Sequence, residues 1–219
     1  MSSPRIALIH ATALAHEPVW DAFARLWPEA RTVNLTDDSL SEDLVELGRL
    51  DADFTDRMVN LTRYAAGCGA AGILFTCSGF GLAIEEAKKA VTIPVLKPDE
   101  AMIVEALSSG ARIAALASFP PTMASLRTEL ESAAARRGLS PVIEIHHVPG
   151  AMDALRTGRV QEHDAFIAHA AERLIACDVL VLAQFSMARA RAAIADIPGR
   201  RVLTSPDSAV RRLRSLLGG

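Results

Sequence analysis

Gly72-Ile73-Leu74-Phe75-Thr76-Cys77-Ser78-Gly79-Phe80-Gly81 joins a short apolar run to a turn rich in small residues. The apolar part favours a buried strand, and the small residues favour a turn that leads into a helix. Similar runs recur along the chain, each followed by helical spacing. The predicted strands are 5–10, 30–35, 72–76, 91–96, 112–117, 142–148, 178–183 and 201–203. The predicted helices are 53–66, 84–90, 98–109, 122–137, 164–176 and 206–217. Apolar strands that alternate with helices are typical of parallel sheets covered on both faces.

The chain also repeats itself at a nearly constant spacing. Positions 5 and 112, which each begin an Arg-Ile-Ala run, are 107 apart, and so are positions 72 and 179, which begin two apolar runs. The matching segments are 5–8 with 112–116, 72–77 with 179–184, 95–96 with 202–203, and 98–101 with 206–209. Two α/β halves can look alike without common origin, but one offset for several elements favours an internal duplication.

The duplication predicts an α/β fold of two similar lobes with mostly parallel sheets, related by a pseudo-twofold axis. We expect the first lobe to comprise residues 1–98 and 206–219, and the second to comprise 99–205. Ligands of open parallel sheets bind beyond the carboxyl ends of the strands. The expected active site therefore lies in the cleft between the lobes, where Cys77 and Gln184 are repeat equivalents.

Composition excludes several classes of function. The chain has 219 residues, 50% of them hydrophobic, with a net charge of −3, so no nucleic acid or anionic membrane partner is expected. No apolar run reaches the roughly 18 residues of a membrane span, and the N-terminus does not resemble a signal peptide. These features predict a cytoplasmic protein.

No cofactor or metal is expected either. The 3 cysteines and 6 histidines form no Cys-x-x-Cys and no His-Glu-x-x-His motif. No Walker loop and no Gly-x-Gly-x-x-Gly follows a strand, so nucleotide binding lacks a motif.

Cys77 is the candidate catalytic residue. A cysteine between a buried strand and a helix lies near free backbone N–H groups, which would lower the pKa of the thiol or bind a substrate carboxylate. Thr76 and Ser78 add hydroxyl donors, and Gly79 lets the backbone approach a ligand. The alternative is a buried cysteine that packs as a small apolar residue.

Other candidates follow neighbouring strands. His10 ends the first strand and is either a substrate ligand or auxiliary acid–base group, or a buried histidine with satisfied hydrogen bonds. Ser118 and Thr122 follow the strand that opens the second lobe, where they bind either a second carboxylate or the start of the next helix. The loop equivalent to that of Cys77 contributes Gln184, Phe185 and Ser186.

The run 72–81, together with residues 93–102, resembles the first cysteine motif of the aspartate/glutamate/hydantoin racemase superfamily. Residues 110–118 resemble the strand that opens that family's second lobe, and 178–188 fall where its second cysteine motif lies. The resemblance covers nearly the whole chain. It implies a cofactor-independent enzyme in which two cysteines face opposite sides of a substrate α-carbon, one removing a proton and the other delivering one.

This chain departs from the pattern because Gln184 occupies the second cysteine position. An amide has no useful pKa and cannot exchange a proton with the substrate, and Cys177 lies at the other end of the same strand. Gly79 also stands where many relatives carry a hydroxyl residue. Arylmalonate decarboxylases of the superfamily use a single cysteine too, but theirs is in the second lobe.

The leading hypothesis is an isomerase or racemase-like enzyme that acts at the carbon next to a carboxylate or carbonyl, with Cys77 as acid–base or nucleophile. A decarboxylase or lyase of the same superfamily, and a non-catalytic protein that binds small carboxylates, remain as alternatives. The expected partner is a small substrate with a carboxylate or carbonyl group, and a homo-oligomer is left open.

Overall fold

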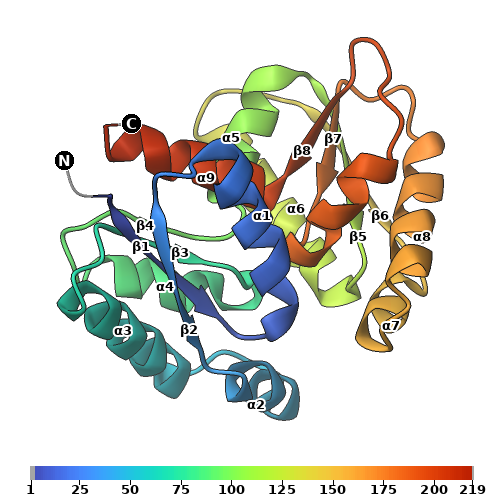
Figure 1. Cartoon of the computed structure of the whole chain (residues 1–219). Coiled ribbons are helices and arrows are strands. Elements are labelled where there is room, and N and C mark those ends of the chain that lie inside the picture. The colour runs from blue at the N-terminus through green and yellow to red at the C-terminus, as the bar shows by residue number, and fades with distance from the viewer. Residues whose placement is uncertain (1–2, 219) are drawn as a thin grey trace. The chain divides into compact units, whose positions relative to one another are not determined.

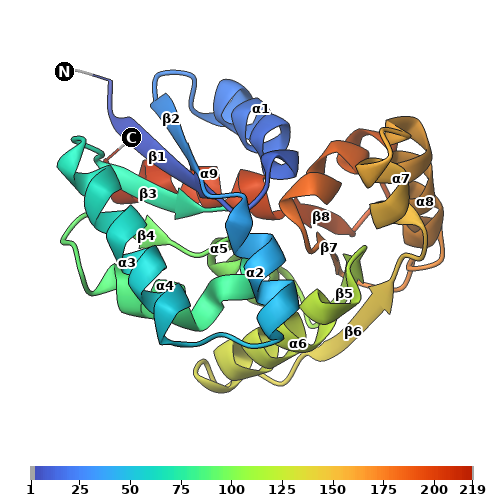
Figure 2. The same cartoon turned by 90° about the horizontal axis from the view of Figure 1, so that it is seen from below.

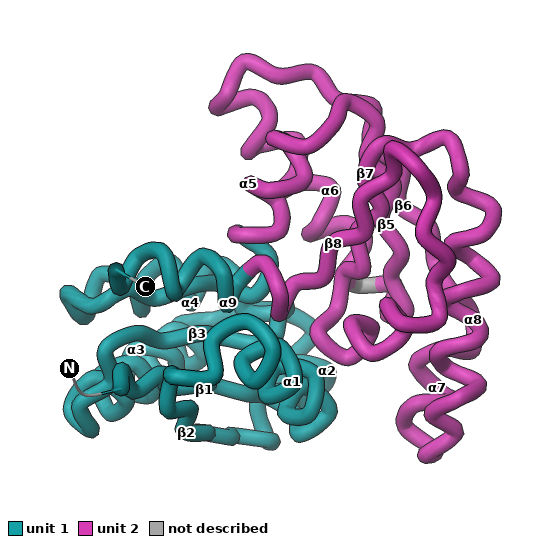
Figure 3. Tube along the Cα trace, turned by 45° about the horizontal axis from the view of Figure 1, so that its top comes forward, with its two compact units in different colours: residues 1–100, 209–219 teal, residues 101–208 magenta. Residues whose placement is uncertain are grey.

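The computed structural model describes residues 3–218. It confirms the α/β class, with two four-stranded parallel sheets in the orders β2-β1-β3-β4 and β6-β5-β7-β8 (Figure 1). The chain divides into two compact units, which are coloured separately in Figure 3. Unit 1 contains the residues up to 100 and from 209 onward, and unit 2 contains residues 101–208.

Unit 1 is built around the first sheet. Its elements are β1 (Arg5–His10), η1 (Ala13–Ala15), α1 (His16–Leu26), β2 (Arg31–Thr36), α2 (Ser39–Leu47), α3 (Ala52–Gly67), β3 (Gly72–Phe75), η2 (Ser78–Phe80), α4 (Gly81–Lys88), β4 (Val95–Leu96) and most of α9 (Ser205–Leu216). One face of β1 and β3 packs against α2, α3 and α4 through buried side chains such as Ile73, Phe54 and Ile84. The helices of this unit are seen from a second side in Figure 2.

Unit 2 is built in the same way around the second sheet. Its elements are α5 (Glu100–Ser109), β5 (Arg112–Ala117), α6 (Pro120–Ala135), β6 (Val142–His147), α7 (Ala151–Arg156), α8 (Val160–Glu172), β7 (Val179–Leu182), η3 (Phe185–Ala193) and β8 (Arg201–Thr204). One face of β5 and β7 packs against α5 and α6. The opposite face packs against α7, α8 and η3. Alternate strand residues supply the two faces, which explains the continuous apolar runs.

The two sheets share their register as well as their strand order, which confirms the internal duplication. Ile6 pairs with Gly72 in unit 1, and Ile113 pairs with Val179 in unit 2. The next strand pair matches too, because the β3–β4 pairing of Ile73 with Val95 recurs as the β7–β8 pairing of Leu180 with Val202. Cys77 and Gln184 therefore follow equivalent strands at equivalent positions.

Three helices lie outside the elements predicted from the sequence, namely α1, α2 and α7. The last of them has only 6 residues and follows Gly150, whose φ of 79° suits glycine. A helix of 6 residues carries a weak periodic signal. In contrast, α1 with 11 residues and α2 with 9 are at least as long as the predicted α5 and α4, and sequence reasoning missed them. Each helix in the described range 3–218 is too short or too polar to span a bilayer.

Gly110 is held where a larger residue does not fit. It precedes β5, and a Cβ atom added at this position would overlap the Cβ of Asp178. Asp178 Oδ2 accepts hydrogen bonds from the backbone N–H groups of Ala111 at 3.0 Å and Arg112 at 2.9 Å, so the carboxylate cannot move away without breaking them.

We therefore expect Gly110→Ala to lower the free energy of unfolding by about 2 kcal/mol, within the range for overpacked sites. Urea unfolding monitored by circular dichroism measures this change. Gly138→Ala is no neutral comparison, because Gly138 has a φ of 65°. Gly67→Ala is the matched control, since nothing lies within 4 Å of the Cβ that it adds. Equal stability of the Gly110 and Gly67 variants would contradict the predicted clash.

Candidate active site

Cys77 lies in the loop that leaves the carboxyl end of β3. The backbone N–H of Thr76 still bonds to Ile9 O at 3.0 Å, so the chain remains attached to the sheet up to this point. Cys77 itself is extended and precedes the single 3₁₀ turn of η2. The ring of Phe80 at the end of that turn is buried and packs against Phe54 on α3, with ring centroids 5.7 Å apart. This contact anchors the loop that carries the thiol.

Burial raises the pKa of the Cys77 thiol, and the negative charge of Asp99 raises it further. A hydrogen bond from the backbone of Gly79 acts in the opposite direction without overcoming burial. The sequence-based expectation of a lowered pKa is therefore wrong for the free protein. The physical reason is that a single 3₁₀ turn supplies few aligned N–H groups, whereas burial penalises the thiolate fully.

The neighbour Asp99 is a feature that sequence reasoning missed. It follows β4, is 6% exposed, and influences Cys77 electrostatically. The register explains its position, because Leu74 of β3 pairs with Leu96 of β4. Cys77 and Asp99 each come three residues after that pair, at the same edge of the sheet. Only the pairing of β3 with β4 would have indicated this.

His10 is fully buried at the end of β1, with both ring nitrogens hydrogen-bonded. Its Nε2 lies 3.0 Å from Asn34 Oδ1, and its Nδ1 lies 2.8 Å from Thr76 Oγ1. Trp20 Nε1–H donates to the same Asn34 Oδ1 at 3.1 Å, which identifies that atom as an acceptor. The neutral ring therefore carries its proton on Nε2 and accepts the hydroxyl proton of Thr76 at Nδ1.

This arrangement ties the residue before Cys77 to three other elements. The chain of bonds runs from Trp20 on α1 through Asn34 on β2 and His10 on β1 to Thr76. His16 packs edge-on against His10, with ring centroids 4.2 Å apart, and its Nε2 lies 3.0 Å from Thr36 Oγ1. Apart from His10 and Thr76, these residues were not among the sequence candidates. No local motif links them. The β1–β2 register places Asn34 and Thr36 beside β1, and α1 supplies Trp20 and His16.

The second unit has a different set of polar side chains at the carboxyl edge of its sheet. Gln184 Oε1 accepts the backbone N–H of Ser118 at 2.9 Å and the Ser118 hydroxyl at 3.2 Å. Thr122 is 7% exposed and its backbone N–H bonds to Phe119 O at 3.1 Å. Phe185 and Ser186 are buried at the start of η3. Ala117 and Ala183 stand where unit 1 has His10 and Thr76.

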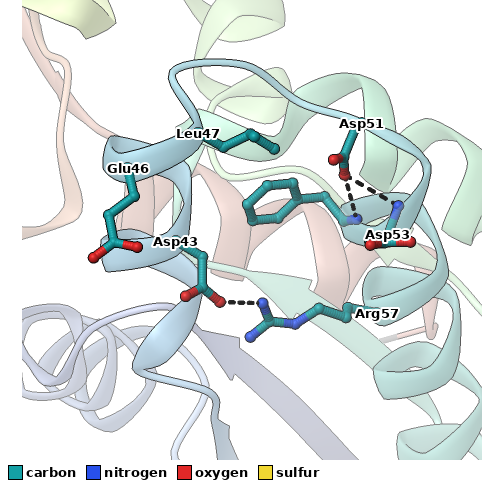
Figure 4. Close-up of a pocket in the computed structure, with 7 residues that line it drawn as sticks. Asp43, Glu46, Leu47, Asp51, Asp53 and Arg57 are labelled. Carbon is teal, nitrogen blue, oxygen red and sulfur yellow. Dashed lines mark hydrogen bonds and ion pairs between the residues drawn. The ribbon is translucent and has the colours of Figure 1, made fainter.

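A pocket of about 440 Å³ lies in unit 1 between α2 and α3 (Figure 4). Its lining is Asp43, Glu46, Leu47, Asp51, Asp53, Phe54 and Arg57. Arg57 already binds the carboxylates of Asp37 and Asp43. A pocket with four carboxylates and one paired cation repels an anionic substrate, and Cys77 is not part of its lining.

Within the described part of the chain, no group of three or more His, Cys, Asp or Glu side chains could hold a metal ion. The side chains at the two sheet edges are a thiol, hydroxyls, amides, a neutral imidazole and the carboxylate of Asp99. They can exchange a proton through Cys77 and donate hydrogen bonds to the oxygen of a ligand.

Comparison with known proteins agrees with this fold. Allantoin racemase from Klebsiella pneumoniae matches with a TM-score of 0.71 and 18% identity over 99% of this chain and 88% of that one. Glutamate racemase RacE1 from Bacillus anthracis matches with a TM-score of 0.70 and 11% identity, over 100% of this chain and 83% of that one. An arylmalonate decarboxylase matches with a TM-score of 0.59 and 16% identity, over 99% of this chain and 93% of that one. None of the curated protein sequences compared with the chain matches it.

The family model described as Asp/Glu/Hydantoin racemase matches residues 11–213, which is most of the chain. The matched segment contains both strand ends described above, with the thiol at position 77 and the amide at position 184. The chain therefore belongs to the Asp/Glu/hydantoin racemase family.

Proposed function

We propose that this protein is a cofactor-independent enzyme that acts at the carbon next to a carboxylate or carbonyl group, with Cys77 as its only proton-carrying thiol. The observation that carries the proposal is the unequal pair at equivalent strand ends, because Cys77 of unit 1 corresponds to Gln184 of unit 2. Family membership supports the reaction class. The missing second thiol argues against proton delivery to both faces of one carbon.

The residues proposed to contact ligand are Thr76, Ser78 and Gly79 at the carboxyl edge of the first sheet, and Thr122, Gln184, Phe185 and Ser186 at the carboxyl edge of the second. His10 and Ser118 act on this set indirectly. His10 holds Thr76 through a buried hydrogen bond, and Ser118 holds the amide of Gln184. We therefore treat these two as positioning residues.

In the isomerase form of the proposal, the Cys77 thiolate removes the proton from the carbon next to the carboxylate or carbonyl. Electrons of the broken C–H bond move into an enolate-like system, whose oxygen receives hydrogen bonds from the donors around it. The thiol then returns the proton to the same face or to a neighbouring atom.

A lyase is the second candidate, and the raised pKa of Cys77 favours it specifically. A thiol that stays protonated near neutral pH is a ready proton donor. When a substrate carboxylate leaves as carbon dioxide, the electron pair of the broken C–C bond remains on carbon. Cys77 would donate its proton to that carbon, and the resulting thiolate would regain a proton from water.

The two forms are tested by incubation in deuterated water. We expect a single enantiomer of a hydantoin or of a monocarboxylic acid to be exchanged or converted without inversion, or an acid with a β-carbonyl group to lose carbon dioxide. Proton and deuterium NMR with chiral chromatography measure these outcomes. Fast inversion with deuterium entering from the opposite face would refute the single-thiol proposal. A ligand that binds with neither exchange nor product would instead identify a non-catalytic binding protein.

A further inference from the structure

The side chain of Gln184 occupies hydrogen-bond donors that an anion would otherwise use. Ser118 follows β5 directly and offers a backbone N–H and a hydroxyl, and both reach Gln184 Oε1, at 2.9 and 3.2 Å. A backbone N–H can only donate, so the atom that it reaches must be the amide oxygen. The orientation of the Gln184 amide is therefore determined, and its nitrogen points away from Ser118.

That nitrogen is the unusual atom of this loop. Gln184 Nε2 is buried, and it has no hydrogen-bond partner among the described residues. Buried polar groups are nearly always paired, because an unpaired donor loses its bonds to water without replacement. An acceptor atom of a ligand that reached this nitrogen at the carboxyl edge of the second sheet would supply the partner that its two N–H groups lack.

The equivalent position in unit 1 is built differently. Register places Ala11 where unit 2 has Ser118, and Cys77 where it has Gln184. Neither side chain there can supply an amide oxygen to the neighbouring backbone. A carboxylate oxygen and an amide oxygen accept hydrogen bonds in similar geometry, so Gln184 Oε1 stands in for one oxygen of a bound carboxylate.

We propose that the Gln184 side chain occupies an anion site of unit 2, formed by the N–H and the hydroxyl of Ser118. Gln184 is thereby a specificity-determining residue. This inference rests on the proposed function and assigns its substrate class. The substrates are acids with a single carboxylate or carbonyl acceptor, and Gln184 Nε2 donates hydrogen bonds to that acceptor. A second carboxylate, as in aspartate or malonate, binds weakly at the Ser118 donors because they are already hydrogen-bonded to Gln184 Oε1.

Isothermal titration with malonate tests the inference in the full chain. We expect Gln184→Ala to bind malonate at least about tenfold more tightly than the unmodified protein, because the Ser118 N–H and hydroxyl become free. Gln184→Met is the matched control, since it fills a similar volume and is expected to show no gain. In the double variant Ser118→Ala/Gln184→Ala, part of the gain is expected to disappear with the hydroxyl.

The amide resonance of Ser118 in ¹⁵N-labelled protein gives a local readout. It is expected to shift on malonate addition in Gln184→Ala but not in the unmodified protein. Unchanged malonate affinity in a folded Gln184→Ala variant would overturn the inference, and so would an equal gain in Gln184→Met. Neither binding measurement depends on turnover. A malonate gain in Gln184→Ala without exchange or product formation by the unmodified protein would therefore reject the proposed function, while the assignment of Gln184 Oε1 to the Ser118 donors would stand.

Discussion

Replacing Cys77 by Ala is expected to lower deuterium exchange or product formation by about 10²- to 10⁴-fold, the usual contribution of one acid–base group. Gln184 cannot take over the proton, and the imidazole of His10 is buried with both nitrogens engaged. Cys77→Ser is expected to lose activity to a similar extent, because a hydroxyl is a far weaker acid than a thiol.

Cys177→Ala is the matched control for loss of a partly buried cysteine. The Cys177 thiol donates to Leu174 O at 3.1 Å, and Cys177 precedes β7, whereas Gln184 follows the other end of that strand. Activity of this variant should remain near that of the unmodified protein. If Cys77→Ala retained full activity while Cys177→Ala lost it, the assignment of the catalytic thiol would be wrong.

The pH profile separates the two forms of the reaction. Because burial raises the pKa of the Cys77 thiol above its ordinary value, the thiolate fraction grows about tenfold per pH unit throughout the range below that raised pKa. A reaction that begins with proton removal by the thiolate should therefore accelerate steadily as pH rises. A reaction that needs the thiol as proton donor should stay constant over the same range. Initial rates in a series of buffers distinguish these outcomes.

Acid is expected to destabilise the protein through His10. Burial lowers the pKa of His10 from 6.5 to about 4, and the nearby His16 adds to this effect. The hydrogen bond to Asn34 acts in the opposite direction without overcoming burial. Between pH 6.5 and about 4, His10 therefore binds a proton in the unfolded chain but stays neutral in the folded protein. The stabilisation is fully present above pH 6.5 and is lost as pH falls toward about 4.

The expected loss across this window is about 3 kcal/mol, from roughly 1.4 kcal/mol per pKa unit. Urea unfolding at a series of pH values measures it. In His10→Gln the titrating group is gone, so this part of the pH dependence should disappear even if the variant is less stable at every pH. Replacing the exposed His147 by Gln serves as the control. An unchanged pH dependence in His10→Gln would show that His10 titrates alike in both states.

The sequence was sufficient for the duplicated α/β architecture and for the equivalence of Cys77 and Gln184. Apolar runs at one recurring offset carry that information locally, because buried parallel strands need continuous apolar residues wherever they occur. The family resemblance rested on the same runs, and the match over residues 11–213 confirms it. The helix α7 escaped prediction because its 6 residues are too few to show a helical period, and it is stabilised by packing on the sheet. The longer α1 and α2 were missed as well.

Only the tertiary structure decided how the site side chains are engaged. The partners of His10, namely Asn34 and Thr76, lie 24 and 66 positions away, and the register of β1 with β2 and β3 brings them together. Burial and Asp99 likewise reversed the expected direction of the Cys77 pKa shift. The bond between Ser118 and Gln184 depends on the β5–β7 pairing. Hydrogen bonds and burial depend on which strands pair, and a linear pattern of residue types does not specify that.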